Sequence, residues 1–262
     1  MTHKASLLCR WVCGAFILLI TATDFPIFAE DQGLAPLLKK GYVRVCADAA
    51  NLPFSSEENA KTPGFEVELA RLIARNIGVD ARFHWILTWV RPFWELKRGE
   101  CDIFMGLPPS ARFKQSNPWI AVSRPYYTMS YAILARADAG ISGPADLAGK
   151  RVAVDAGRPA EYWLLDHGFE RGIYKRQENV FRGVEIGEAP AGLLPFPIAM
   201  WMSRDKTNLV VIPLAEPSLE VALGAATRRE DAALTEAVDT AVAGLLATGA
   251  VAEVLHRYHA IP

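Results

Sequence analysis

Polar side chains that could bind a small solute follow three runs of the chain that have the character of strands. The runs are 43–47, 101–105 and 151–155. In an open α/β sheet, ligands bind beyond the carboxyl ends of the strands, so the loops at these ends should face a cleft. The residues expected there are Asp48, Asn51, Phe54, Gly106, Asp155, Arg158 and Glu161. A second interpretation is that Arg158 and Pro159 only start a helix, whose first turn favours Glu161.

Catalytic chemistry has little support in the sequence. His84 lies between Phe83 and Trp85 in a strand-like run, and no histidine is obviously paired with a nucleophile or an acid. His256 and His259 are one helical turn apart, but a third metal ligand is missing. The sequence has no Gly-x-Ser-x-Gly motif and no phosphate-binding glycine loop. We therefore expect no catalytic residue, no metal and no cofactor.

The N-terminus has the features of an export signal. Lys4 and Arg10 precede an uncharged apolar stretch at 11–23, which is shorter than the roughly 20 residues that a membrane span needs. Ala29 suits a cleavage site, so we expect 1–29 to be a signal peptide and the mature protein to be periplasmic. An uncleaved membrane anchor is the alternative.

Cleavage would leave two cysteines, Cys46 and Cys101, in an oxidising compartment. An even pair in such a compartment favours one disulfide. If the strands that carry them end level, however, the thiols are offset by about three residues, or roughly 10 Å, which is beyond bridging distance. Two buried free thiols are therefore the alternative.

Aromatic side chains gather in one short segment, which contains Trp85, Trp89, Phe93 and Trp94. Packing in the core explains most such residues. Aromatic side chains are also the usual anchors of protein interfaces, so Trp89 or Trp94 exposed at the rim of the cleft would support docking to a large partner.

The elements that must position these residues alternate between strands and helices. The first set predicts strands at 43–47, 81–86 and 101–105, with helices at 63–77 and 90–98. The second set predicts strands at 151–155, 180–181 and 209–212, with a helix at 159–167. The last 32 residues have helical spacing. Such alternation predicts βαβ units and mainly parallel sheets.

Two segments predict that the chain crosses between two lobes. Residues 126–134 contain neither Gly nor Pro and have the character of a crossing strand. If the last helices pack on the first lobe, the chain crosses again near 219–226, and two crossings make a hinge. We therefore expect an α/β fold with lobe 1 at 30–130 and 220–262 and lobe 2 at 131–219.

The composition narrows the class of partner. The chain has 262 residues, 51% of them hydrophobic, and its 28 Lys and Arg nearly balance its 29 Asp and Glu. It therefore has no broad basic field for nucleic acid, and small molecules or proteins are the expected partners.

An exported two-lobed chain with Arg124-Pro125-Tyr126-Tyr127 before its first crossing resembles the type II periplasmic solute-binding proteins of ABC transporters, family 3. A narrower similarity lies in the segments 44–48, 51–55, 64–66 and 99–106. These segments resemble the methanol-oxidation J-type proteins encoded beside quinoprotein methanol dehydrogenases. The resemblance implies a periplasmic accessory of a pyrroloquinoline-quinone (PQQ) dehydrogenase or its cytochrome, in place of a transporter component.

The resemblance also implies roles for single residues. Arg112 matches the position at which amino-acid-binding members hold a carboxylate, and a surface salt bridge is the alternative. The second-lobe acid that would hold an α-amino group is not evident, because Pro190 and Phe196 occupy that segment. Pro190 and Pro195 cannot donate ladder hydrogen bonds, so we expect the central strand of the second lobe to be broken, shortened or at an edge.

Three functions follow from these residues. The first is a non-catalytic accessory that docks to a quinoprotein methanol dehydrogenase. The second is the solute-binding component of an ABC transporter for a small polar solute, with a permease as its partner. The third is an exported lyase, for which Asp48, Asp155 and Glu161 are the available acids. We expect the first, because the narrower similarity is more specific than the general fold.

Overall fold

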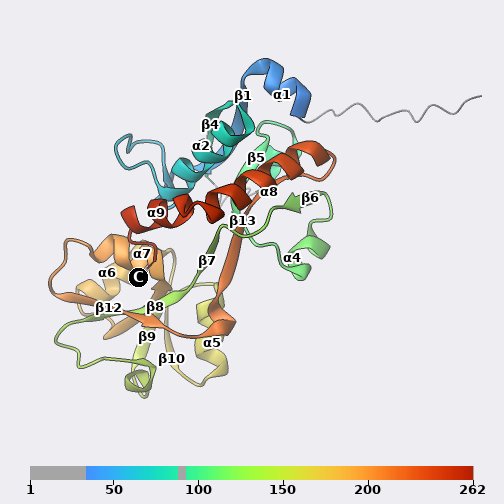
Figure 1. Cartoon of the computed structure of the whole chain (residues 1–262). Helices are drawn as coiled ribbons and strands as arrows, with labels where there is room; N and C mark the ends of the chain where they lie inside the picture. Colours follow the sequence, from blue (N-terminus) through green and yellow to red (C-terminus); the bar gives the residue numbers. More distant parts are fainter. Residues whose placement is uncertain (1–33, 88–92, 262) are drawn as a thin grey trace, which may run out of the picture. The chain divides into compact units, whose positions relative to one another are not determined.

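The computed structural model describes residues 34–87 and 93–261. The predicted signal peptide at 1–29 and the predicted docking residue Trp89 lie outside these ranges. The described chain has the predicted two-lobed α/β fold, built on two main sheets (Figure 1). No single helix within the described ranges is long and apolar enough to span a membrane.

The first sheet contains the strands of the first predicted set. Its order is β4 (Asp80–Ile86), β1 (Tyr42–Asp48), β5 (Ile103–Leu107), β13 (Val221–Arg228) and β6 (Ile120–Val122), and β7 (Tyr127–Met129) also pairs with β13. β4, β1 and β5 are parallel, and β13 joins them antiparallel. A hairpin of β2 (Ala50–Asn51) and β3 (Ser55–Ser56) follows β1.

Helices cover both faces of this sheet. They are α1 (Leu34–Lys40), α2 (Phe65–Ile77), α3 (Trp94–Lys97), α4 (Ala111–Ser116), α8 (Ala232–Ala247) and α9 (Ala250–Arg257). Alternate residues of β1 separate the two faces, because Val45 packs with α2, α8 and α9 while Cys46 packs with Leu96 of α3. α2 ends at Gly78, whose φ of 92° gives the left-handed cap that glycine adopts without strain.

The second sheet has the order β10 (Glu170–Tyr174), β9 (Arg151–Asp155), β11 (Ala191–Pro195), β8 (Tyr131–Arg136) and β12 (Leu209–Leu214). α5 (Pro159–Asp166) packs on one face with Ile133. α6 (Gln177–Glu185) and α7 (Phe196–Ser203) pack on the other face with Leu134. Two short 3₁₀ turns, Pro144–Leu147 and Pro217–Leu219, complete the described elements.

The chain passes between the sheets after β7 and again before β13. β8 and β13 run antiparallel to the strands beside them, so each sheet is mixed and only its βαβ part is parallel. Ser130 divides the predicted crossing strand into β7 and β8. α7 also contacts the core of the first sheet, where the ring centroids of Trp201 and Tyr258 are 5.8 Å apart.

Two predictions about the second lobe are wrong. Val180 and Phe181 lie in α6, where they form a buried helical stripe with Val184 in place of a strand. β11 is a fully buried strand between β9 and β8, and it is neither broken nor at an edge. Pro190 precedes this strand and Pro195 is its last residue, so neither proline removes a hydrogen bond from its interior.

Candidate functional site

The carboxyl ends of the first-sheet strands bring Asp48 near a buried glutamate. Asp48 is the last residue of β1, and its carboxylate accepts the Ala50 N–H at 3.0 Å. Glu66, in the first turn of α2, is buried and accepts the Tyr126 hydroxyl at 2.7 Å. Burial raises the pKa of Glu66 to about 7, the Tyr126 hydrogen bond opposes this, and the nearby charge of Asp48 adds to it. This end of the sheet therefore holds a carboxyl group that exchanges its proton near neutral pH.

Gly106 has no side chain, and this leaves room for the carboxyl group of Glu66. Its φ is +81°, and a Cβ at this position would lie 2.5 Å from Glu66 Oε1. The backbone of Gly106 also hydrogen-bonds the Tyr126 hydroxyl. Gly106 was expected at a ligand cleft, and its contacts give it a structural role in holding Glu66 and Tyr126.

Asn51 and Phe54 lie in the hairpin that follows β1. The Asn51 carbonyl accepts the Phe54 N–H at 2.8 Å, which closes the turn. Phe54 is 8% exposed, and its ring centroid lies 4.7 Å from that of Phe65. The structure therefore places Phe54 in the core, where its ring fills the space between the hairpin and α2.

Arg112 lies on α4, after the N-cap residue Ser110. Its side chain is exposed, and it has no hydrogen bond or ion pair with any of the residues that the structure describes. The surface salt bridge considered as its alternative role is thus not formed within this part of the chain. The guanidinium group can accept a carboxylate on two parallel donors.

A small hollow lies at the carboxyl ends of β9 and β11. Its polar lining consists of Tyr131, Asp155, Arg158 and Gln177, and Pro195 closes one side. Asp155 accepts the Arg158 Nε–H at 3.1 Å on one oxygen and the Arg176 backbone N–H at 2.8 Å on the other. Burial raises the pKa of Tyr131 to about 12, so its hydroxyl remains a donor at neutral pH.

Glu161 is not part of this hollow. Its two carboxylate oxygens accept the Gly157 N–H at 2.6 Å and the Arg171 guanidinium at 2.9 Å. Arg158 is the N-cap of α5 and Pro159 its first residue, as in the helix-start interpretation. Within 34–87 and 93–261, no cluster of three or more His, Cys, Asp or Glu side chains is placed to hold a metal ion.

Four residues of these two regions were not identified from the sequence: Glu66, Tyr126, Tyr131 and Gln177. An acid in the first turn of a helix is expected from the helix dipole alone, so nothing local indicated that Glu66 is buried. Tyr131 was noted as part of the crossing segment, and Tyr126 as part of that segment and of the run at 124–127, but neither was assigned to a site.

Trp94 has the exposure that a docking role requires. It is 46% exposed at the start of α3. The Arg98 guanidinium lies 5.9 Å from its ring centroid and pairs with Glu95 at 2.6 Å. The surface beside the ring is therefore polar, with its charges largely paired.

Cys46 and Cys101 form the predicted disulfide, with their Cα atoms 5.5 Å apart. The objection from strand register assumed an extended strand that begins at Cys101. β5 begins at Ile103, so Cys101 precedes the strand and is free of its register. The disulfide therefore ties β1 to the chain just before β5.

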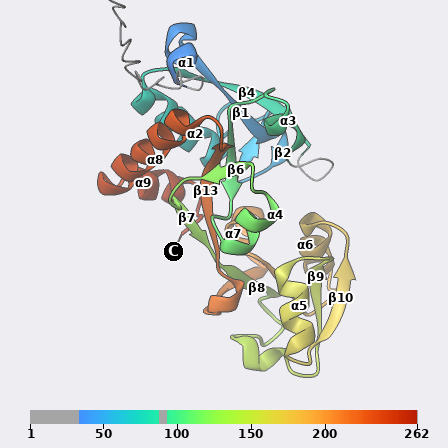
Figure 2. The ribbon, with the colours of Figure 1, turned by 90° about the vertical axis from the view of Figure 1, so that its right-hand side faces the viewer.

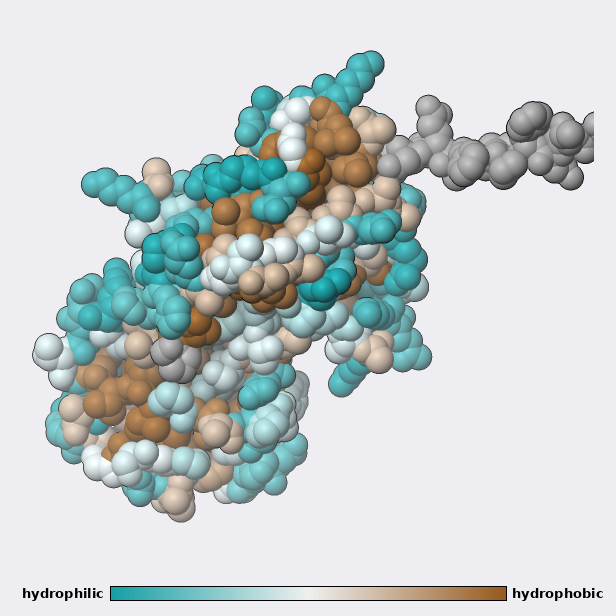
Figure 3. Space-filling view, in the orientation of Figure 1, coloured by the Kyte–Doolittle hydropathy of each residue, from teal (hydrophilic) through white to brown (hydrophobic). Residues whose placement is uncertain are grey.

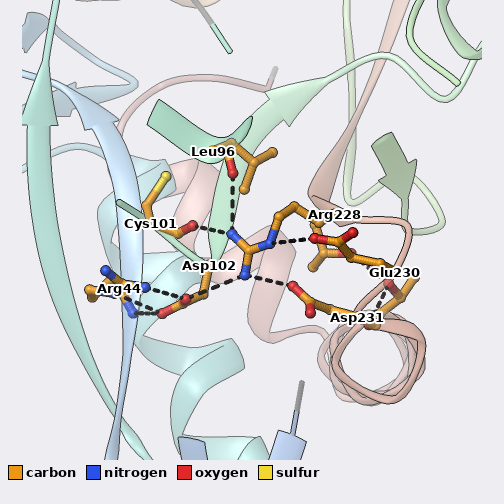
Figure 4. Close-up of polar contacts among 9 residues, drawn as sticks. Arg44, Leu96, Cys101, Asp102, Arg228, Glu230 and Asp231 are labelled. Atoms are coloured by element: carbon orange, nitrogen blue, oxygen red, sulfur yellow. Dashed lines mark hydrogen bonds and ion pairs between the residues drawn. The ribbon is translucent and has the colours of Figure 1, made fainter. Parts of the chain in front are cut away.

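A partly buried arginine lies next to this disulfide (Figure 4). Arg228, at the end of β13, donates to the carbonyls of Cys101 at 2.8 Å and Leu96 at 3.2 Å. It also pairs with Asp231 at 2.6 Å. One guanidinium group thus joins β13, α3 and the disulfide.

Asp102 extends this network to β1. Burial alone would raise the pKa of Asp102, but the hydrogen bonds and charge of Arg44, 2.8 Å away, hold the pKa below its ordinary value. Arg228 lies 3.7 Å from the same carboxylate. These contacts link β1, the segment before β5 and β13 within the first lobe.

A two-lobed α/β fold with polar strand ends in both lobes is an architecture that can bind a small solute. The family of bacterial extracellular solute-binding proteins, family 3, matches residues 43–261. The chain belongs to this family.

Curated relatives differ in their named roles. The arginine-binding extracellular protein ArtP of Bacillus subtilis is 25% identical over 200 residues, covering 72% of this chain and 75% of ArtP. Protein MoxJ of Methylorubrum extorquens is 26% identical over 241 residues, covering 77% of this chain and 76% of MoxJ.

Solved structures support the same fold. The ancestral cationic amino acid solute-binding protein AncCDT-1 is 26% identical, with a TM-score of 0.73 over 86% of this chain and 98% of its own. A second solved structure is also of AncCDT-1, which is there named an ancestral amino acid-binding protein and a precursor of cyclohexadienyl dehydratase. The relatives named here are thus binding proteins, MoxJ apart, and one of them is the precursor of an enzyme.

Proposed function

We propose that the protein is a non-catalytic exported accessory of a PQQ-dependent methanol dehydrogenase and that it acts by docking to that enzyme or its cytochrome. The segments around Cys46 and Cys101 carry the resemblance to the J-type proteins, and the similarity to MoxJ supports it. In this proposal residues 1–29 are a cleaved signal peptide, and Trp89 and Trp94 belong to the docking surface.

The hollow at the ends of β9 and β11 is the observation that carries the proposal. β11 ends in Pro195 and α7 begins at Phe196, so this strand end offers no acid to a ligand's amino group. Asp155 is the acid of the hollow, and both of its oxygens already accept hydrogen bonds. The hollow has essentially no space for even a water-sized molecule, so an amino acid does not fit in it as it stands. These features favour a protein partner over an amino acid.

The exposed ring of Trp94 supplies the kind of anchor that docking needs. Tryptophan is enriched among the residues that dominate binding energy at protein interfaces. Covering a ring that is 46% exposed removes apolar surface from water without breaking any core contact of the free protein.

Solute binding for an ABC transporter is the second candidate, and Arg112 favours it. Its exposed guanidinium group is free of partners in the described chain, as a carboxylate-binding arginine should be. Asp48, Asn51 and Gly106 would supply the first-lobe side of that site, and Asp155 and Arg158 the second-lobe side. ArtP, an arginine-binding relative, is the precedent.

Binding measurements separate the two candidates. The purified protein is titrated with a quinoprotein methanol dehydrogenase and with its cytochrome, and its melting temperature is measured with arginine, cystine and other amino acids. Docking predicts a complex with the enzyme or with its cytochrome, and a melting temperature that the amino acids leave unchanged. A bound amino acid at 100 times its Kd would raise the melting temperature by about 5 to 10 °C.

Two variants test the docking surface. Trp94→Ala should weaken the complex by about tenfold or more, because it removes the exposed anchor. Leu38→Ala is the matched control, since Leu38 is 47% exposed and Trp94 46%. A rise in melting temperature with an amino acid, together with no binding to the enzyme or the cytochrome, would overturn the proposal and establish solute binding.

A further inference from the structure

The second sheet has two edge strands, β12 and β10, and they differ in how well they can pair with another chain. Hydrophobic residues reach the surface in the lower left of Figure 3, where Figure 1 labels β12. β12 contains Pro213, which has no N–H to donate to a further strand and so disfavours pairing at this edge. β10 contains no proline, and within the described ranges no strand pairs with its outer side. Figure 2 shows β10 at the margin of the sheet.

Exposed apolar side chains accompany this open edge. Ile173 of β10 is 52% exposed, and Tyr162 and Leu165 of α5 are 56% and 51% exposed. Figures 1 and 2 both show α5 beside β10, and an ion pair of 2.9 Å between Glu161 and Arg171 joins the two elements. Single exposed apolar residues are ordinary, but three on two adjoining elements at an open edge form a contact surface.

The sequence of β10 is compatible with antiparallel pairing to itself. If the two strands cross at Gly172, Arg171 lies opposite the partner's Ile173, and Glu170 lies opposite the partner's Tyr174. No like charges face each other in this register. Shifting the crossing point to Ile173 would place Arg171 opposite the partner's Lys175, and like charges directly opposite are destabilising.

We propose that β10 and α5 form the interface of a homodimer, in which the β10 strands of two copies pair antiparallel about Gly172. A two-fold axis perpendicular to the sheet extends it across both copies. The same axis brings α5 beside the partner's α5, so that Tyr162 and Leu165 cover their counterparts. Arg171 enters the seam already paired with Glu161, so its burial leaves no unpaired charge.

This inference concerns the protein alone and does not depend on the proposed dehydrogenase partner. Sedimentation velocity of the purified protein between about 1 and 100 µM should give a concentration-dependent species of twice the chain mass. Ile173→Lys should weaken the dimer by at least about 100-fold, because it places a charge in the strand seam. Ile186→Lys is the matched control, since Ile186 is 56% exposed and lies outside β10 and α5.

Cysteine cross-linking tests the register. In the proposed pairing, positions 171 and 173 of the two copies lie opposite each other, so Arg171→Cys combined with Ile173→Cys should oxidise to a covalent dimer. Ile173→Cys alone should not, because its counterpart is displaced by two residues. A monomeric wild type at 100 µM, an unchanged dimer in Ile173→Lys, or equal loss in Ile186→Lys would each overturn the proposal.

Discussion

Replacing Glu66 with glutamine tests the chemistry of the buried carboxyl group. Glutamine has nearly the same shape as a protonated glutamate and can still accept the Tyr126 hydroxyl, which lies 2.7 Å from Glu66. It cannot ionise. The variant should therefore reproduce the wild-type fold at low pH and depart from wild-type stability only where Glu66 loses its proton.

The sign and size of the change in stability with pH follow from the pKa of Glu66. The pKa of Glu66 is about 7 in the fold against an ordinary value of 4.5. Between these values the folded protein binds more protons than the unfolded chain, so the free energy of unfolding falls as the pH rises. At about 1.4 kcal/mol for each pKa unit, the loss amounts to about 3 kcal/mol by pH 8 and is absent below pH 4.5.

Urea unfolding at several pH values between 4.5 and 8 measures this effect. We consider the free energy of unfolding of Glu66→Gln minus that of wild type. This difference should increase by about 3 kcal/mol between pH 4.5 and pH 8. Glu57→Gln, at an exposed position, should follow wild type at every pH. Tyr126→Phe removes the hydrogen bond that opposes the upward pKa change, so its loss of stability should extend to higher pH.

A constant difference between Glu66→Gln and wild type across this range would refute the reasoning. It would mean that Glu66 has the same proton affinity in the folded and unfolded chain, and so that water reaches the carboxyl group. A difference that shrinks as the pH rises would refute it as well, because the ionised carboxylate would then be stabilised by the fold.

Three further predictions concern the stability of the first lobe, each measured by urea unfolding. Reducing the disulfide, which joins residues separated by 55 positions, should cost about 4 kcal/mol through the entropy of the unfolded chain. Arg228→Met should cost about 3 to 5 kcal/mol because it leaves buried partners unpaired, whereas Glu230→Gln, at the exposed end of the network, should cost less than about 0.5. Gly106→Ala should destabilise more than Gly140→Ala, because both glycines have positive φ but only Gly106 would place its Cβ against another residue.

Much of the fold could be predicted from local patterns. The spacing of Phe65, Leu69 and Ile73 indicated α2, and Gly78 marked its end. The alternation of such helices with short apolar runs predicted βαβ units. The extended segment at 126–134 indicated the first crossing, and the expected packing of the last helices on the first lobe implied the second. Periodicity of this kind is a property of neighbouring residues, so a sequence displays it directly.

The errors arose where local and tertiary signals compete. Val180 and Phe181 have high strand propensity, but the position of Val184 on the same face made them one side of a helix. Pro190 and Pro195 would break a strand that they interrupted, but Pro190 precedes β11 and Pro195 is the last residue of its pairing with β8. The strand propensity of single residues does not determine where the hydrogen-bonded pairing of a strand begins and ends.

The candidate site divides in the same way. The sequence by itself determined that polar residues follow the strands, that Asp48, Asp155 and Arg158 lie at strand ends, and that Cys46 and Cys101 suit a disulfide. Only the tertiary structure decided that Glu66 is buried beside Tyr126 and Gly106, that Asp155 is already hydrogen-bonded on both oxygens, and that β10 is an open edge. Burial and strand order depend on contacts between residues far apart in the chain, and no local pattern of residues records those contacts.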